Sequence, residues 1–349
     1  MKKERNNMKK IVSLLLALAM ILALTACGGG NTPATTAAPD KTTAAPGGSD
    51  YEYKGDRLTI GGADSTGTMY AAAVAVATTF TNNINGMNVD ATTSSGSNEN
   101  ALKVNSGEIQ LGMCSGDAAL SAVNGTGKFA DQGKQENICA IGAVYPSLSN
   151  WIALKSSGYT YLHDAKGTFG IGPSASTSES SALLGLETVG ITKDNANLVN
   201  VTLGEGADNV ADGTMNASTA FAGVPVGALA NAANTKDCVL LGFTDEELDK
   251  IVAANAAYYK ATIPAGTYKG QDADVPTFGV KCMVICNKEL GDAEAYQMAK
   301  TLYEQAEKMI EGNKFFYNMA DKSFIATDLP ISLHPGAEAF YKEVGLIGK

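Results

Sequence analysis

Four short loops rich in Gly, Ser and Thr carry the residues of this chain that are best suited to bind a ligand. Each loop follows an expected strand and precedes an expected helix, at residues 61–68, 94–98, 115–117 and 172–178. The first backbone N–H groups of a helix have no partner inside the helix and carry partial positive charge. Small residues let a ligand approach these groups, so such loops bind anions. We expect the four loops to share one ligand cleft, although any single loop could serve only as a helix cap.

The chain holds few residues suited to catalysis or to metal binding. Its two histidines, His163 and His334, have no second ligand at metal-site spacing, and no Gly-x-Ser-x-Gly elbow offers a nucleophile. Residues 122–129 resemble a phosphate-binding loop only in part, because Ala122 replaces its first Gly and Phe129 its Ser or Thr. We therefore expect no metal, no cofactor and no enzymatic activity.

The cysteines are expected to be structural. Five follow Cys27, namely Cys114, Cys139, Cys238, Cys282 and Cys286. An odd number leaves at least one thiol unpaired in any intramolecular scheme. Cys282 and Cys286 lie on one expected strand, about 13 Å apart, which is too far for a disulfide. We predict buried thiols that act as small apolar side chains.

The N-terminal residues indicate where the protein works. Lys9 and Lys10 precede an uncharged apolar segment, residues 11–24, which is short for a membrane span. The following Leu-Thr-Ala-Cys27 resembles the box at which bacterial lipoproteins are cleaved and lipidated. We predict a lipoprotein signal peptide over residues 1–26, with Cys27 anchoring an extracytoplasmic protein to the bacterial cell membrane. An ordinary signal peptide is the alternative.

Composition sets the limits on the rest of the chain. Residues 27–50 are rich in Gly, Thr, Ala and Pro, which predicts a disordered tether. Residues 51–349 are enough for two lobes of ordinary size. The formal net charge of −10 argues against binding to nucleic acid or to anionic lipid. No seam for self-association is evident, so we expect a monomer.

The order of the elements predicts an α/β fold. From Leu58 onward, a strand, a small polar loop and a helix follow one another three times. The later expected elements are strands over residues 151–155, 168–171, 198–203, 218–221 and 278–286, and helices over residues 179–189, 208–215, 290–311 and 335–344. Such alternation is typical of a parallel sheet covered by helices, in which ligands bind at the carboxyl ends of the strands.

Several motifs occur in an order that resembles one family of receptors. They are Leu58-Thr-Ile-Gly-Gly, Ser65-Thr-Gly-Thr-Met-Tyr70, Ser95-Gly-Ser-Asn-Glu-Asn100, Ser115-Gly-Asp117, Ala220-Phe-Ala-Gly-Val-Pro225, Ile263-Pro-Ala-Gly-Thr-Tyr268, Val275-Pro-Thr-Phe-Gly-Val280 and Leu333-His-Pro-Gly-Ala-Glu338 with Phe340-Tyr341. Together they resemble the TAXI family, the solute receptors of tripartite ATP-independent periplasmic (TRAP) transporters. The resemblance covers residues 58–345.

The resemblance implies a type II periplasmic-binding-protein-like fold, in which two α/β lobes joined by a hinge close on a ligand in the cleft between them. Lobe 1 would comprise residues 51–152 and lobe 2 residues 153–280, with residues 281–349 returning to lobe 1. The implied partner is a TRAP membrane permease driven by an ion gradient, and the implied solute is a small carboxylate or amino acid such as glutamate. A ligand-sensing lipoprotein with the same cleft is the alternative, and an exported enzyme would lack an evident catalyst.

The expected cleft is built from helix starts rather than from an arginine clamp. Arg57, the only arginine after the signal peptide, precedes the first strand, so backbone N–H groups and hydroxyls, with or without a lysine, would hold a carboxylate. The candidate ligand-binding residues are Ser65, Thr66, Gly67, Thr68, Tyr70, Gly96, Ser97, Asn100, Ser115 and Asp117 from lobe 1, and Ser174, Ser176, Thr177 and Gly223 from lobe 2.

A few side chains could have either of two roles, and others are expected to have a purely structural role. Asp117 could accept a hydrogen bond from a ligand ammonium or cap a helix. The adjacent tyrosines Tyr258 and Tyr259 could line the cleft rim or a partner surface, or pack on their own lobe. We expect His334 to cap the C-terminal helix and Trp151 to pack in the core. Where the family often has Gly, this chain has Ala175, whose Cβ could narrow the pocket.

Overall fold

The computed structural model describes residues 51–65 and 67–348. The expected signal peptide, the tether with Cys27, and the candidate site residue Thr66 lie outside the described residues. The strands are β1 (Leu58–Gly61), β2 (Val89–Thr92), β3 (Leu111–Ser115), β4 (Ile138–Leu154), β5 (Thr168–Gly170), β6 (Asn197–Val199), β7 (Ala217–Ala222), β8 (Cys238–Leu241), β9 (Tyr259–Ile263) and β10 (Val275–Asn287). The α-helices are α2 (Thr68–Asn83), α3 (Ser97–Ser106), α4 (Gly116–Asn124), α5 (Thr177–Thr188), α6 (Leu203–Ala211), α7 (Gly227–Thr235), α8 (Asp245–Ala254), α9 (Asp292–Gly312), α10 (Ser323–Ala326) and α11 (Pro335–Glu343).

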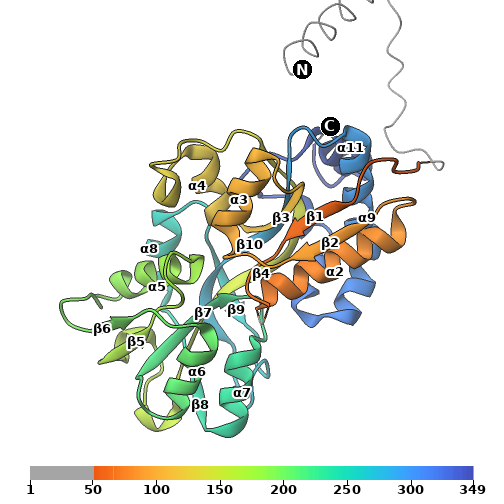
Figure 1. Cartoon of the computed structure of the whole chain (residues 1–349). Helices are drawn as coiled ribbons and strands as arrows, with labels where there is room; N and C mark the ends of the chain where they lie inside the picture. The colour runs from red at the N-terminus through yellow and green to blue at the C-terminus, as the bar shows by residue number, and fades with distance from the viewer. Residues whose placement is uncertain (1–50, 66, 349) are drawn as a thin grey trace, which may run out of the picture. The chain divides into compact units, whose positions relative to one another are not determined.

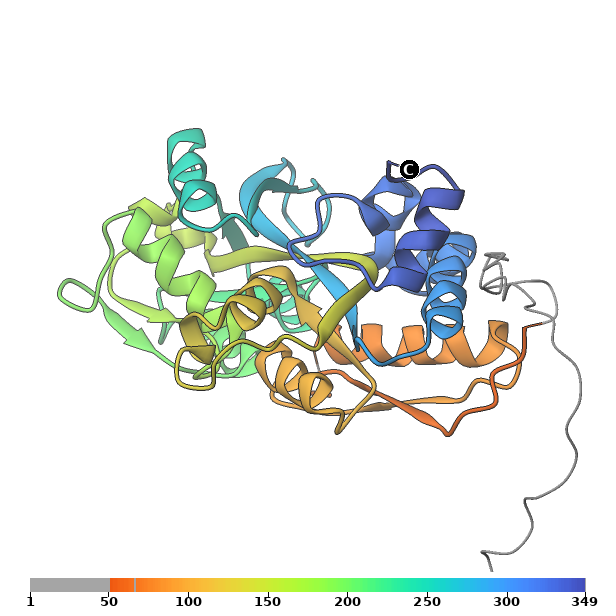
Figure 2. The same cartoon turned by 90° about the horizontal axis from the view of Figure 1, so that it is seen from above.

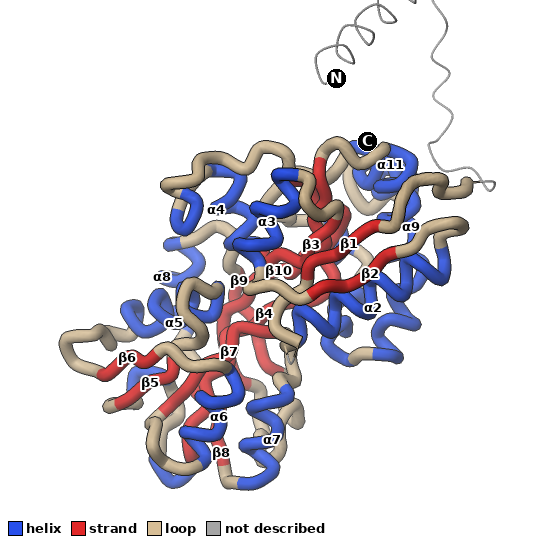
Figure 3. Tube along the Cα trace, in the orientation of Figure 1, coloured by secondary structure: helices blue, strands red, loops and turns tan. Residues whose placement is uncertain are grey.

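The strands form one continuous mixed sheet. Its order is β2-β1-β3-β10-β4-β7-β5-β6, with β8 paired to β4 and β9 paired to β10. The pairs β1–β2, β1–β3, β5–β6 and β5–β7 are parallel. The long strands β4 and β10 are antiparallel to each other and to their other neighbours. Figure 3 shows the strands as a band that continues from one half of the described chain into the other.

The sheet is shared by two lobes, each with its own apolar core. In the first lobe, α2, α9 and α11 cover one face of the sheet, and α3 and α4 cover the other. In the second lobe, α5 and α8 cover one face, and α6 and α7 the other. The two lobes occupy the upper right and lower left of Figure 1, and Figure 2 shows them side by side from above.

Only β4 and β10 contribute to the cores of both lobes among the described strands. Val144 of β4 packs in the first lobe and Trp151 in the second, while Val280 of β10 packs in the second and Val284 in the first. Successive strand residues point to opposite faces, so each strand serves both faces of both lobes. These two paired strands are therefore the connection about which the lobes can move.

Strand β4 is longer than the sequence suggested. We expected a strand only over residues 151–155, whereas β4 starts at Ile138. The apolar sequence pattern of this strand is interrupted by Pro146, which lacks a backbone N–H, and by the polar residues Ser147 and Asn150. Pro146 and Ser147 nevertheless pair in regular register with Lys281 and Val280 of β10, and the register shifts lie further along β10, between Cys282 and Met283 and between Val284 and Ile285.

The expected core residues are buried. Trp151 is completely buried against Phe169 in the second lobe, as predicted. The five cysteines that follow the tether are buried as well. In the described part of the chain, no helix combines the length and apolar character that a bilayer span requires.

The C-terminal helix starts as its sequence predicts. His334 is the N-cap of α11, and its Nδ1 accepts a hydrogen bond from the Gly336 N–H at 3.2 Å. Its Nε2 lies 3.3 Å from the Lys288 carbonyl oxygen, and the side chain is buried. Tyr341 of the same helix donates to the Ile141 carbonyl of β4 at 3.0 Å, which ties the helix to the sheet.

We predict that His334→Ala lowers the free energy of unfolding by about 2 kcal/mol, because it removes a cap and leaves a small cavity. His334→Asn should recover part of the loss, because Asn is a good N-cap. Urea unfolding at constant m-value measures both. Equal losses for the two variants would contradict the capping role.

Candidate functional site

Two hydrogen bonds between neutral groups link the first lobe to the second. Thr68, at the start of α2, donates its hydroxyl to the Gly223 carbonyl beyond β7 at 3.3 Å. Asn98, in the first turn of α3, donates its amide to the Ala175 carbonyl of the loop before α5 at 3.2 Å. Two loops of the first lobe thus meet two loops of the second.

Charged and phenolic groups cross the same gap. Lys128 Nζ lies 3.6 Å from Glu179 Oε2 of α5. Tyr258, which lies between α8 and β9, donates its hydroxyl to Asp117 Oδ2 at 2.9 Å. Tyr258 and Asp117 are both buried, so this hydrogen bond is shielded from bulk water.

A polar cavity of about 300 Å³ lies at this interface. It is lined by Asn98, Asp117, Ala118, Ser121, Gly127 and Lys128 from the first lobe, and by Thr177, Ser180, Leu184, Ala254, Asn255 and Tyr258 from the second. Of the candidate residues, Asp117 and Thr177 line this cavity directly. The cavity is large enough for a small organic solute.

A larger hollow of about 600 Å³ lies elsewhere and has a different character. Its lining, which includes Tyr53, Gln110 and Glu294, comes from the first lobe alone. It sits beside the first residue of β1, at the opposite end of that strand from the helix starts. The smaller cavity, which both lobes enclose, is therefore the candidate functional site.

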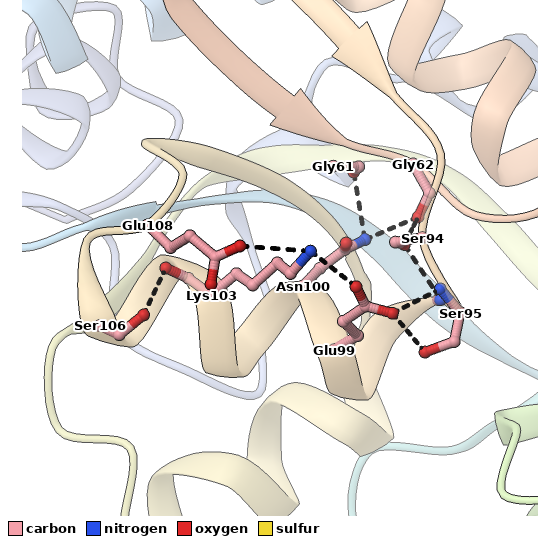
Figure 4. Close-up of polar contacts among 10 residues, drawn as sticks. Gly61, Gly62, Ser94, Ser95, Glu99, Asn100, Lys103, Ser106 and Glu108 are labelled. Carbon is pink, nitrogen blue, oxygen red and sulfur yellow. Dashed lines mark hydrogen bonds and ion pairs between the residues drawn. The ribbon is translucent and has the colours of Figure 1, made fainter.

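Asn100, one of the candidate residues, supports the site without facing it. Its buried side-chain amide donates to the carbonyl oxygens of Gly61, Gly62 and Met113 at 3.1, 2.6 and 2.8 Å. Figure 4 shows the amide directed at the end of β1. Asn100 thus fastens α3 to the ends of β1 and β3.

Glu99 holds the loop in front of the same helix. Its carboxylate accepts from the Ser95 N–H and hydroxyl and pairs with Lys103 at 2.8 Å (Figure 4). The hydrogen bonds from Lys103 and then Ser95 lower the pKa of Glu99 to about 2. The charged Glu99 therefore fixes the Ser-Gly-Ser loop over the ordinary pH range.

Ser97 and Ser115 meet, but they do so within the first lobe. The Ser97 hydroxyl accepts from the Ser115 N–H at 3.0 Å, and the two hydroxyls lie 3.1 Å apart. Both residues are buried and neither lines the cavity. They join the start of α3 to the end of β3.

The other candidates occupy loop and helix-start positions. Gly67 and Gly96 are the N-caps of α2 and α3, and Ser176 caps α5 by accepting from the Glu179 N–H at 3.2 Å. Ser65 and Ser174 are exposed, and Tyr70 is half-buried. The caps Gly67, Gly96 and Ser115 use no side chain to cap their helices.

Several residues of the cavity were missed by sequence reasoning. Lys128 belongs to the segment that was set aside as a partial phosphate-binding loop, and Asn98 lies inside a loop whose other members were named. Ser121 and Asn255 gave no local signal. Both readings for Tyr258 hold, since its ring packs on Phe221 and Phe278 of its own lobe and its hydroxyl reaches Asp117 across the gap.

Asp117 was expected either to bind a ligand ammonium or to cap a helix, and it is not the N-cap of α4. The N-cap of α4 is Ser115, and Asp117 follows in the first turn. Burial raises the pKa of Asp117, while hydrogen bonds from Ser115, Tyr258 and the backbone N–H groups of the first turn oppose this rise. Oδ1 itself has no hydrogen-bond partner of good geometry in the described structure.

Glu179 and Arg57 are both ionised. Glu179 lies at the interface between the lobes, whereas Arg57 lies outside it. Burial alone would raise the pKa of Glu179, but hydrogen bonds from Asn200 and Ala175 and the nearby Lys128 outweigh it and lower the pKa. Arg57 forms an exposed ion pair with Asp90 at 2.7 Å, ahead of β1 and outside the cavity lining. Lys128 is therefore the cation that lines the cavity among the described residues.

Two lobes on one mixed sheet, crossed by two long strands and facing each other across a polar cavity, define the class of protein. The chain has the two-lobe α/β fold that the sequence predicted, with both lobes built on one mixed sheet. Residues 60–345 match the model of the NMT1-like family, and the chain belongs to this family.

The expected membership of the TAXI family is wrong, because the family model that matches residues 60–345 is the NMT1-like one. The motifs that suggested it are short runs of Gly, Ser, Thr and Pro that loops of many α/β proteins use. The expectations of a TRAP permease and of glutamate rested on that resemblance and are withdrawn with it.

Solved structures similar to this chain include transport-related binding proteins. The alkanesulfonate-binding protein SsuA from Xanthomonas axonopodis pv. citri, bound to MOPS, is 12% identical, with a TM-score of 0.43 over 83% of this chain and 84% of that one. The periplasmic aliphatic sulphonate binding protein SsuA from Escherichia coli is 11% identical, with a TM-score of 0.44 over 84% of each chain. The ligand binding component of an ABC-type import system from Staphylococcus aureus, with zinc bound, is 11% identical, with a TM-score of 0.44 over 84% of this chain and 93% of that one.

Gly223 is a point where the lobes touch too closely for a side chain. A Cβ there would lie 2.9 Å from both Thr68 Cγ2 and Tyr145 Cδ2. Overpacking of this kind costs about 1–3 kcal/mol, so we expect Gly223→Ala to reduce the population with touching lobes by a factor of about 5 to 150. Small-angle X-ray scattering should show a larger radius of gyration than for the unmodified protein.

The matched control for this variant is Gly227→Ala. A Cβ at Gly227, the first residue of α7, would meet nothing within 4 Å. Its scattering should equal that of the unmodified protein. The same scattering for both variants would show that Gly223 is not what permits the approach.

Ala175 is strained in the loop that meets Asn98. Its φ of 62° lies in the left-handed region that favours glycine. We predict that Ala175→Gly raises the free energy of unfolding by about 0.5–1 kcal/mol, since relief of strain exceeds the entropy that glycine loses on folding. Urea unfolding measures the change, and Ala130→Gly, at an exposed alanine with φ −55°, should instead destabilise the protein. Destabilisation by both changes would contradict the strain.

Proposed function

We propose that this protein is an extracytoplasmic receptor that captures a small polar solute between its lobes and delivers it to a membrane transporter. One observation carries the proposal. Residues far apart in sequence, Asp117 and Tyr258 above all, meet across the gap between the lobes and enclose a polar cavity. A site assembled by the approach of two lobes suits reversible capture.

The mechanism follows from the arrangement of the connecting strands. Apart from β4 and β10, each described strand belongs to one lobe, so the lobes can rotate while their cores stay packed. A solute in the cavity would add contacts to both lobes and shift the population toward the closed form. The closed surface is then what a transporter would recognise.

The chemistry of the lining favours a small solute with an acidic group. The starts of α2, α3 and α4 lie at this side of the first lobe without side-chain caps, and Lys128 lines the cavity. Open helix starts and an ammonium both favour an anionic group. We propose an organic acid or amino acid, held by N–H groups, hydroxyls and Lys128 rather than by arginine.

The place of action is proposed from the sequence before the described residues. The apolar segment over residues 11–24 and the following Leu-Thr-Ala-Cys27 support export and a lipid anchor on Cys27. The body would then work at the outer surface of the cell membrane, close to a transporter.

A ligand-stabilisation screen tests the function. Purified full-length protein is heated with separate organic acids, amino acids, amines and sugars, and one chemical class should raise the unfolding temperature saturably. A solute at 100 times its dissociation constant adds about 2.7 kcal/mol of stability. The compound must be recovered unchanged after incubation. Chemical conversion of the compound, or stabilisation by no class of solute, would contradict the receptor function.

A further inference from the structure

Asp117 is a buried carboxylate with one oxygen left open. The side chain is 6% exposed and lines the cavity between the lobes. Oδ2 accepts the Tyr258 hydroxyl from the second lobe at 2.9 Å, whereas the buried Oδ1 has no hydrogen-bond partner in the described structure. Native proteins rarely leave a buried polar atom without a partner, so such an atom needs an explanation.

The open oxygen is free to accept a hydrogen bond from a solute. A carboxylate that is taken out of water needs a partner charge or hydrogen bonds, and the raised pKa of Asp117 reflects the same cost of burial. A metal ion would need further ligands, but within the described residues no group of three His, Cys, Asp or Glu side chains is arranged so that it could hold a metal ion. An anion alone would be repelled. A charged N–H donor fits both the charge and the missing hydrogen bond.

A cation of the chain faces the same cavity from another side. Lys128 lines the cavity with its side chain about half exposed, and its 3.6 Å separation from Glu179 is long for an ion pair that also forms a hydrogen bond. The lining thus holds one anionic side chain, Asp117, and one cationic side chain, Lys128. A molecule with opposite charges at its two ends complements this arrangement.

We infer that the solute is a zwitterion whose protonated amine docks on Asp117 Oδ1 and whose acidic group faces Lys128. The inference rests on the proposed receptor function and narrows its solute to amino-acid-like compounds. Tyr258 is a positioning residue in this account. Its hydroxyl donates to Oδ2 of Asp117 from the opposite lobe, which leaves Oδ1 for the amine. The contact that joins the closed lobes and the contact that recognises the amine therefore share one carboxylate.

The test compares solutes that differ only in the amine. Isothermal titration of full-length protein uses each α-amino acid beside the α-keto acid and the 2-hydroxy acid of the same side chain. At least one amino acid should bind, and its two amine-free analogues should bind at least tenfold more weakly. This comparison needs no variant, so it stands even if a substitution impairs folding.

Variants then assign the two ends of the solute. Asp117→Asn keeps the shape and should weaken the amino acid at least tenfold while leaving its keto acid unaffected. Lys128→Met should weaken both acids, and the control Lys166→Met, at an exposed lysine outside the cavity lining, should weaken neither. Circular dichroism checks that each variant is folded.

The zwitterionic nature of the solute and the receptor function itself are overturned by different results. Tight binding of an amine-free solute, with no loss in Asp117→Asn, would overturn the zwitterion and leave the receptor standing. Equal binding of an amino acid and its keto acid would do the same. Binding of no solute from any class would remove the receptor function itself.

Discussion

The antiparallel pairing of β4 with β10 is the constraint on which the rest of the structure depends. Their register runs from Gly279 opposite Leu148 to Asn287 opposite Ile138, and each strand passes from one core into the other. A shift of this register by one residue would turn the core-facing side chains of one of the two strands to the opposite face and disrupt apolar clusters in both lobes. The pairing therefore fixes where each lobe stands and leaves the interface between them free of a common apolar core.

The polar residues of the interface divide into those that build the loops and those left available to a solute. The side chains of Asn100, Ser97 and Glu99 make their hydrogen bonds within the first lobe, where they hold the helix starts against the strand ends. Asp117 keeps an oxygen open, and Lys128 stays partly solvated. A buried charge without a full set of partners lowers stability, and proteins keep such groups where function uses them. This division explains why residues of the same loops have different roles.

The sequence allowed the class of fold and the loops at the site to be predicted, because strand periodicity and small-residue turns are local signals. The α11 cap at His334 and the burial of Trp151 were also correct. The direction in which the Asn100 side chain points could not be predicted, since it depends on how β1 and β3 pair. Tyr258 lies 141 residues from Asp117, and no local pattern reports so distant a contact. The family assignment failed for a related reason, since short loop motifs reflect backbone needs shared by many α/β proteins.

The most direct test of the account measures the distance between the lobes in solution. Spin labels on p-acetylphenylalanine placed at Asp131 and Asp194, exposed positions of the first and second lobes, avoid labelling any cysteine. Double electron–electron resonance on the full-length protein then gives the distance distribution with and without a stabilising solute. The account predicts a broad distribution that narrows and shortens when solute is saturating. An identical distribution in both samples would contradict a receptor that closes on its solute.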